Sequence, residues 1–211
     1  MKLTLPKNQP ALTFNFVSFQ ALIFNPFLLM ITLFGKKKLT EEKVANIFIN
    51  GVQTLIDEGF DDVIGLINDS PEFLRPPNIS REDIGTFTVI VLAGNIQVIP
   101  RFFEAGQDKR ITQCILEKFA ELYDTDKMSL AKMVSETRSL MMRKNHPSKS
   151  VANAMARIIF CKYELNQYQE EYFKSLDSPN PIFIQRLKEA MGNFIWNWDM
   201  LLERFKIVQT V

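Results

Sequence analysis

The sequence predicts an all-α protein, a compact multi-helix bundle of roughly six to eight helices, and three observations support this fold class. Apolar residues recur at helical spacing in most of the chain after residue 38, and short polar turns separate these segments. No internal repeat is visible. A chain of 211 residues can bury one sizeable core. We therefore expect a single α-helical domain over residues 39–211, preceded by an apolar segment with a lysine cluster at residues 1–38.

The first helix of the domain is expected to begin after Thr40, whose hydroxyl can cap it. Glu41 and Glu42 place negative charge at the positive end of the helix dipole. One buried face is predicted by the helical spacing of the apolar stripe Val44, Ile47, Phe48, Gly51, Val52 and Leu55. Gly59 is expected to end this helix, and a short amphipathic segment at 63–67 follows it.

A run without charged residues extends from Ile84 to Pro100, after a capping-box pattern formed by Ser80 and Asp83. Its β-branched residues favour strands, and a hairpin turning near Gly94 is the alternative to a helix. Strict alternation is missing and no partner strands are evident elsewhere, while an isolated hairpin is only marginally stable. We therefore predict a buried central helix.

The middle of the domain is expected to hold three helices. One is capped by Asp108 and carries the apolar stripe Ile111, Cys114, Ile115, Phe119 and Leu122. A second is predicted over 128–144, and the turn at 145–148 leads into a third that begins near Val151.

The last helix is predicted to be the longest. Asn180 followed by Pro181 is a helix start signal, because proline suits the first helical position. On a helical wheel, one broad apolar face extends as far as Phe205. Trp196 falls on the opposite face, which is otherwise charged.

Residues Asn8 to Gly35 carry no charge, and Lys36, Lys37 and Lys38 follow them directly. Within this run, Phe14 to Phe34 is long enough to cross a bilayer as a helix. Pro26 would kink such a helix near its middle and remove a backbone donor.

Three interpretations of this segment are open. A membrane anchor would put the helical domain at the inner, cytoplasmic face, because lysines flank the apolar run on that side. A start-site artefact would have translation begin at Met30, so that residues 1–29 are not made. The third is a buried terminal helix of the domain. A cleaved secretory signal is less favoured because no small-x-small cleavage site follows the run.

Charge is balanced overall, at a net +1, but it is distributed unevenly. An acidic block over 57–72 has no basic residue, and a basic block over 138–162 has no acidic one. We expect the basic block to be mainly solvated surface, in part facing the acidic block. Cys114 and Cys161 are predicted to be buried thiols, which favours a reducing, cytoplasmic location.

No catalytic motif is recognised, so an enzyme is the less favoured class. The single histidine, His146, lies in a turn, and neither cysteine has a sequence neighbour that would activate it. Phosphate-binding glycine loops and nucleophile elbows do not occur. We therefore predict no catalytic, cofactor or metal residues.

Candidate partner-binding residues are Trp196, Arg143, Lys144 and Lys149. An exposed tryptophan is typical of binding hot spots, although another part of the same chain could equally cover Trp196. The leading interpretation is a non-enzymatic interaction or scaffolding domain that acts through a protein partner or self-association. One alternative is a cytoplasmic helical module tethered to a membrane by Phe14 to Phe34. Another is a nucleic-acid-associated regulator that uses the basic block.

Overall fold

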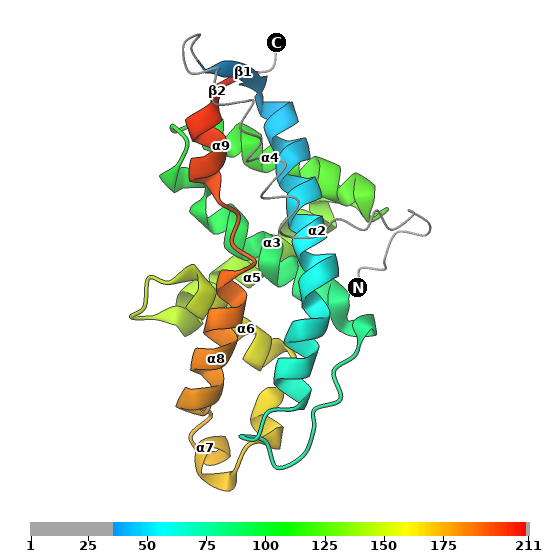
Figure 1. The fold of residues 1–211 in the computed structure, drawn as a ribbon, viewed down its shortest axis with the longest axis vertical. Helices are drawn as coiled ribbons and strands as arrows, with labels where there is room; N and C mark the ends of the chain where they lie inside the picture. Colours follow the sequence, from blue (N-terminus) through cyan, green and yellow to red (C-terminus); the bar gives the residue numbers. More distant parts are fainter. Residues whose placement is uncertain (1–35, 210–211) are drawn as a thin grey trace, which may run out of the picture.

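The computed structural model describes residues 36–209, and within them it confirms the all-α class, with eight α-helices and two short strands. The three interpretations of the apolar N-terminal segment concern residues that lie outside this range. Figure 1 shows an elongated arrangement, with the strand pair β1–β2 at one end and the short helix α7 at the other.

Helix α2 (Glu41–Asn68) is the longest of the described helices. Its predicted start is confirmed, because the Thr40 side chain accepts a hydrogen bond from the backbone N–H of Lys43. The prediction that Gly59 ends the helix was wrong, since α2 continues without a break to Asn68. Gly59 has a packing role instead: a Cβ at this position would lie 2.7 Å from the Phe194 ring.

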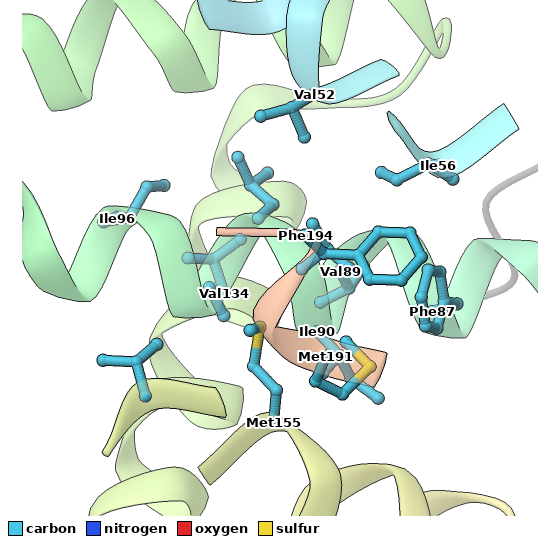
Figure 2. Packing of buried hydrophobic residues seen from close by; sticks show 14 of the residues in the cluster. Val52, Ile56, Phe87, Val89, Ile90, Ile96, Val134, Met155, Met191 and Phe194 are labelled. Atoms are coloured by element: carbon cyan, nitrogen blue, oxygen red, sulfur yellow. The ribbon is translucent and has the colours of Figure 1, made fainter. Parts of the chain in front are cut away.

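Helix α3 (Ile84–Val98) is the predicted buried central helix, and its flanks are the 3-10 turns η2 (Arg81–Asp83) and η3 (Ile99–Arg101). The Ser80–Asp83 capping box is present. Figure 2 shows Val89 and Ile90 of α3 in one apolar cluster with Val52 of α2 and Met155. Among the described helices, only this region (Arg81–Arg101) is long and apolar enough to cross a membrane, and 72% of its window is buried inside the fold, as in a core helix.

Helices α4 (Gln107–Leu122), α5 (Lys127–Asn145) and α6 (Val151–Lys162) complete the middle of the bundle. Helix α4 packs along α2, whereas α5 and α6 pack on α3 and on each other. The predicted cap at Asp108 was wrong by two residues, because the helix begins after Gly106. The Asp108 carboxylate lies inside the first turn and accepts from the backbone N–H of Gly106.

The C-terminal part is η4 (Leu165–Tyr168), α7 (Glu171–Ser175), α8 (Pro181–Gly192) and α9 (Trp198–Arg204). The predicted start is confirmed, since the Asn180 side chain caps α8. The prediction of one long helix to Phe205 was wrong. Helix α8 ends at Gly192, and the non-helical segment 193–197 separates it from α9.

Two short strands that the sequence analysis did not predict join the two ends of the described chain. Strand β1 (Lys37–Thr40) pairs in parallel with β2 (Phe205–Val208), with Lys37 opposite Phe205. Each strand has only four residues, too few to show a clear alternating pattern.

The buried side chain of Asn95 holds the segment 193–197 against α3. Its amide Nδ2 donates to the carbonyl oxygens of Val91 at 2.9 Å and Phe194 at 2.8 Å. Its Oδ1 accepts from the backbone N–H of Trp196 at 2.7 Å. These bonds give main-chain groups at the helix break the partners that a continued helix would have supplied.

Trp196 does not lie on a charged helix face, because the break places it outside any helix. Its ring packs over Gly51 of α2, where an added Cβ would lie 2.1 Å from Trp196 Cζ3. The ring also meets Phe48 edge-on at a centroid distance of 6.0 Å. Gly51 is therefore required by a close approach between α2 and the C-terminal segment.

We predict that Gly51→Ala destabilises the protein because the new methyl group overlaps the Trp196 ring. Overpacking of this kind costs about 1–3 kcal/mol, and the gain in helix propensity offsets about 1 kcal/mol of it. Gly192→Ala is the matched control, since no atom lies within 4 Å of a Cβ there. Urea unfolding followed by circular dichroism measures both. Equal free energies of unfolding for the two variants would contradict the packing described.

Candidate functional site

Arg143, Lys144 and Lys149 lie close in sequence, at the end of α5 and in the turn before α6, and we call them the basic corner. All three are exposed. Lys144 Nζ lies 4.0 Å from a carboxylate oxygen of Asp177, beyond the end of α7. Arg143 and Lys149 form no ion pair with any residue in the range 36–209.

The acidic and basic blocks form no ion pair with each other within the described part of the chain. Two residues of the acidic block form ion pairs with arginines outside the basic block. Asp61 pairs with Arg81 at 2.8 Å, and Glu72 pairs with Arg186 at 3.0 Å. The hydrogen bond from Arg81 holds the pKa of Asp61 below its usual value. The expectation that the two blocks face each other therefore has no support, and most cations of the basic block remain solvated.

Two members of the basic block, Arg157 and Arg138, are half-buried, and the others are exposed. Burial lowers the pKa of the Arg138 guanidinium, and the Arg138 Nε is buried without a hydrogen-bond partner in residues 36–209. Because Arg138 and Arg157 are half-buried, the basic block does not form one continuous exposed stripe that a nucleic-acid backbone could follow.

The prediction of Trp196 as a partner site depended on its exposure on a helix, and that premise was wrong. The residue is half-buried, and its indole Nε1 is enclosed without a described partner. Much of its surface is covered by α2 of the same chain. A role in binding a partner stays a prediction, for the remaining exposed part of the ring.

The two cysteines were predicted to be buried, which was wrong for both. Cys161 is exposed and Cys114 is half-buried. Partial burial raises the pKa of the Cys114 thiol, an effect that nearby Glu117 adds to. In residues 36–209, no group of three or more His, Cys, Asp or Glu side chains is placed to hold a metal ion.

Several segments that carry exposed apolar side chains meet at the α7 end of the molecule. Six large apolar side chains in the described range are more than half exposed: Leu74, Met128, Met142, Tyr172, Leu176 and Ile182. Four of these, which we call the α7-end patch, are Leu74, Tyr172, Leu176 and Ile182, with exposures between 58% and 72%. They belong to the loop after α2, to α7 and its end, and to the start of α8, which meet at one end in Figure 1.

Gln169 fixes the relative positions of these segments. Its side chain is almost fully buried; the amide donates to the carbonyl of Ser178 at 3.0 Å, and its oxygen accepts from the backbone N–H of Asn180 at 2.6 Å. Beneath the patch, the rings of Phe73 and Phe183 lie 4.6 Å apart. The backbone N–H of Leu74 also donates to the Tyr168 carbonyl at 2.8 Å. The patch therefore rests on an ordered base.

Charges of both signs surround the α7-end patch. We call six exposed charged residues on and beside the segments of the patch the rim: Glu170, Glu171 and Asp177, with Arg75, Lys144 and Lys174. Within the chain, Lys144 lies 4.0 Å from Asp177 and Lys174 lies 3.8 Å from Glu171. The Arg75 guanidinium lies over the Tyr168 ring at 5.4 Å. The rim thus carries no excess of either charge.

Sequence reasoning missed the patch because its residues come from segments about 100 positions apart. One local signal was available: Tyr172 and Leu176 have the i, i+4 spacing of neighbours on a helix face, and charged residues flank them. The other two residues, Leu74 two positions before Pro76 and Ile182 directly after Pro181, lie where prolines interrupt any periodic pattern.

No protein-family model, curated protein or solved structure matches this chain. The assignment of a function therefore depends on the geometry of the described residues.

We predict that Glu72→Gln destabilises the protein at neutral pH. Burial raises the pKa of Glu72, but hydrogen bonds from Ser70 and the Glu72 backbone, together with Arg186, lower it more, so its pKa lies below the usual value. A carboxyl group of this kind stabilises the fold above its unfolded pKa, and that contribution is lost as the pH falls through the folded pKa. We expect a loss of about 1–3 kcal/mol at neutral pH.

Urea unfolding at pH 7 and pH 3 tests this. The difference in unfolding free energy between wild type and Glu72→Gln should narrow at the lower pH, because the stabilising contribution of the Glu72 carboxylate falls as the pH drops below its unfolded pKa. Glu58→Gln, at an exposed position on α2, is the control and should be close to wild type at both pH values. A penalty of the same size at both pH values would rule out the charge of Glu72 as its cause.

Proposed function

We propose that this protein is a non-enzymatic α-helical interaction domain that self-associates through the α7-end patch. One observation carries the proposal: four of the six highly exposed large apolar side chains in residues 36–209 belong to segments that meet at the α7 end. Single exposed apolar residues are ordinary, whereas a group of them on an ordered base is typical of a protein interface.

The free energy gained by burying the patch is similar in size to the cost of association. Covering each of these side chains, which are roughly two-thirds exposed, contributes about 1–2 kcal/mol. A two-fold dimer covers the patch on both copies, which gives about 8–16 kcal/mol in total. Association itself costs about 4–15 kcal/mol. We therefore expect a concentration-dependent equilibrium and not an obligate dimer.

A second copy of the chain is the occupant that the charges favour. In a two-fold interface the same surface faces itself, so a balanced rim can place each carboxylate of one copy near a cation of the other. A strongly acidic or basic partner would be selected by a rim of one sign, and so would an anionic bilayer. The rim has no such excess.

The position of the patch keeps it separate from the membrane-tether hypothesis. Lys36 donates to the carbonyl of Leu202 beside the β1–β2 pair, at the opposite end of the molecule from α7. The described chain therefore begins at the end opposite the α7-end patch, so a tether before Lys36 is compatible with a second copy at the patch.

Nucleic-acid binding has less support. The basic corner offers three cations, one of which lies near Asp177. Proteins that depend on phosphate contacts commonly make about 6–10 of them. The basic corner alone is a small footprint for that purpose.

We predict that Leu176→Glu abolishes self-association while the monomer stays folded, because the side chain is exposed and the new charge would be buried in the dimer. Sedimentation velocity on the full chain, from about 1 to about 300 µM, measures this. Wild type should shift from monomer towards dimer across the range, and Leu176→Glu should stay monomeric.

Met128→Glu is the matched control, since Met128 is also more than half exposed but lies in the first turn of α5. This variant should associate like wild type. All three proteins carry residues 1–35, so association through that segment would be the same in each. Association of Leu176→Glu with the affinity of wild type would overturn the proposal, and so would a monomeric wild type across the whole range.

A further inference from the structure

A cavity of about 180 Å³ lies between the start of α3, the middle of α5 and the end of α6. Its inner wall is apolar and includes Val89, Ile90 and Met133. Its polar lining includes Glu82, Glu136 and Lys162, which are all exposed. The cavity is therefore lined by apolar and charged side chains together.

Thr137 is a largely buried residue that lines this cavity. The residue is only 5% exposed, and its side chain makes no hydrogen bond to any described residue. Its hydroxyl oxygen is not itself enclosed, so a molecule in the cavity can reach it. A hydroxyl group can donate one hydrogen bond to such a molecule and accept others from it.

The charges of the lining are also unpaired. Glu82, Glu136 and Lys162 form no ion pair with one another or with any other residue in the described range. Asp83, which also lines the cavity, is occupied in part by capping the backbone N–H of Ser80 at 3.0 Å. Opposite charges thus surround one cavity without neutralising each other directly.

We propose that this cavity binds a small zwitterion with an apolar body, of the kind represented by a free α-amino acid with a side chain like that of leucine. The ligand ammonium would lie towards Glu82 and Glu136 and its carboxylate towards Lys162. Its apolar side chain would rest on the inner wall, and the Thr137 hydroxyl would bond to one of its polar groups. This orientation gives every unpaired group of the cavity a partner.

The size and charge of the cavity limit other ligand classes. A cavity of about 150 Å³ holds a benzene molecule, so one of similar volume accepts a branched aliphatic side chain but not a nucleotide. Free phosphate would be repelled by the carboxylates of Glu82 and Glu136. A divalent cation would be repelled by Lys162 and would leave the apolar wall uncovered.

The test is isothermal titration calorimetry on the full chain with three probes of one carbon skeleton. The probes are leucine, isoamylamine, which lacks the carboxylate, and isocaproate, which lacks the ammonium. Leucine should bind most tightly, and each truncated probe should bind about tenfold more weakly or worse, because it leaves a charged group of the cavity unpaired. Absence of leucine binding at about 10 mM would overturn the proposal, and so would equal affinity for leucine and isoamylamine.

Two conservative variants test which residue binds the ligand carboxylate and which binds its ammonium. Lys162→Gln should reduce the affinity for leucine about tenfold and leave that for isoamylamine unchanged. Glu136→Gln should weaken both leucine and isoamylamine. Both residues are exposed, so the fold should be kept, and unfolding curves check this. Affinity for leucine that is unchanged in both variants would place any binding outside this cavity.

Thr137→Val tests the contribution of the hydroxyl, and Lys174→Gln is the control outside the cavity. Thr137→Val keeps the side-chain shape and removes the hydroxyl, so it should weaken leucine binding severalfold. Lys174→Gln changes a lysine at the α7 end and should bind leucine like wild type. The result is independent of self-association, because the cavity is lined by α3, α5 and α6 with the turn before α3, and not by the α7-end patch.

Discussion

The arrangement of the C-terminal third depends on one buried amide, that of Asn95. An amide in an apolar core costs about 1–3 kcal/mol unless it is hydrogen-bonded. Asn95 bonds to three main-chain groups, two of which, the Phe194 carbonyl and the Trp196 N–H, lie about 100 residues further along the chain. The chain between α8 and α9 must leave the helical path to reach the Asn95 side chain. This break determines how the residues after α8 pack.

The break sets where each aromatic residue after α8 packs. Phe194 reaches Gly59 and Trp196 reaches Gly51, so two glycines of α2 receive two rings. Trp198 stacks on Phe48 at 5.2 Å. Helix α9 then leads to β2, which pairs with β1, while α8 extends towards α7. The molecule consequently has two distinct ends, one with the paired strands and Lys36 to Lys38, the other with the exposed apolar patch.

Short sequence patterns predicted correctly the features that depend on neighbouring residues. The caps at Thr40 and Asn180 and the capping box at Ser80 are confirmed, and the uncharged run after it is the buried α3. The end of α8 at Gly192 could not be predicted from the sequence, because apolar residues continue at helical spacing beyond it. The hydrogen bonds that favour the break over a continued helix come from Asn95, which is distant in sequence. Gly59 is a residue type that often ends helices, but here it leaves room for the Phe194 ring. The patch and the cavity each combine segments distant in sequence, which periodicity within one segment does not reveal.

Native-state hydrogen exchange of the Trp196 backbone N–H tests the central role of Asn95 most directly. This N–H lies outside any helix, and its described partner is the Asn95 side chain. If Asn95 organises the core, the N–H should exchange only through global unfolding, with an opening free energy equal to the global stability. Exchange at the rate of an open loop, or with an opening free energy well below the global value, would contradict the account.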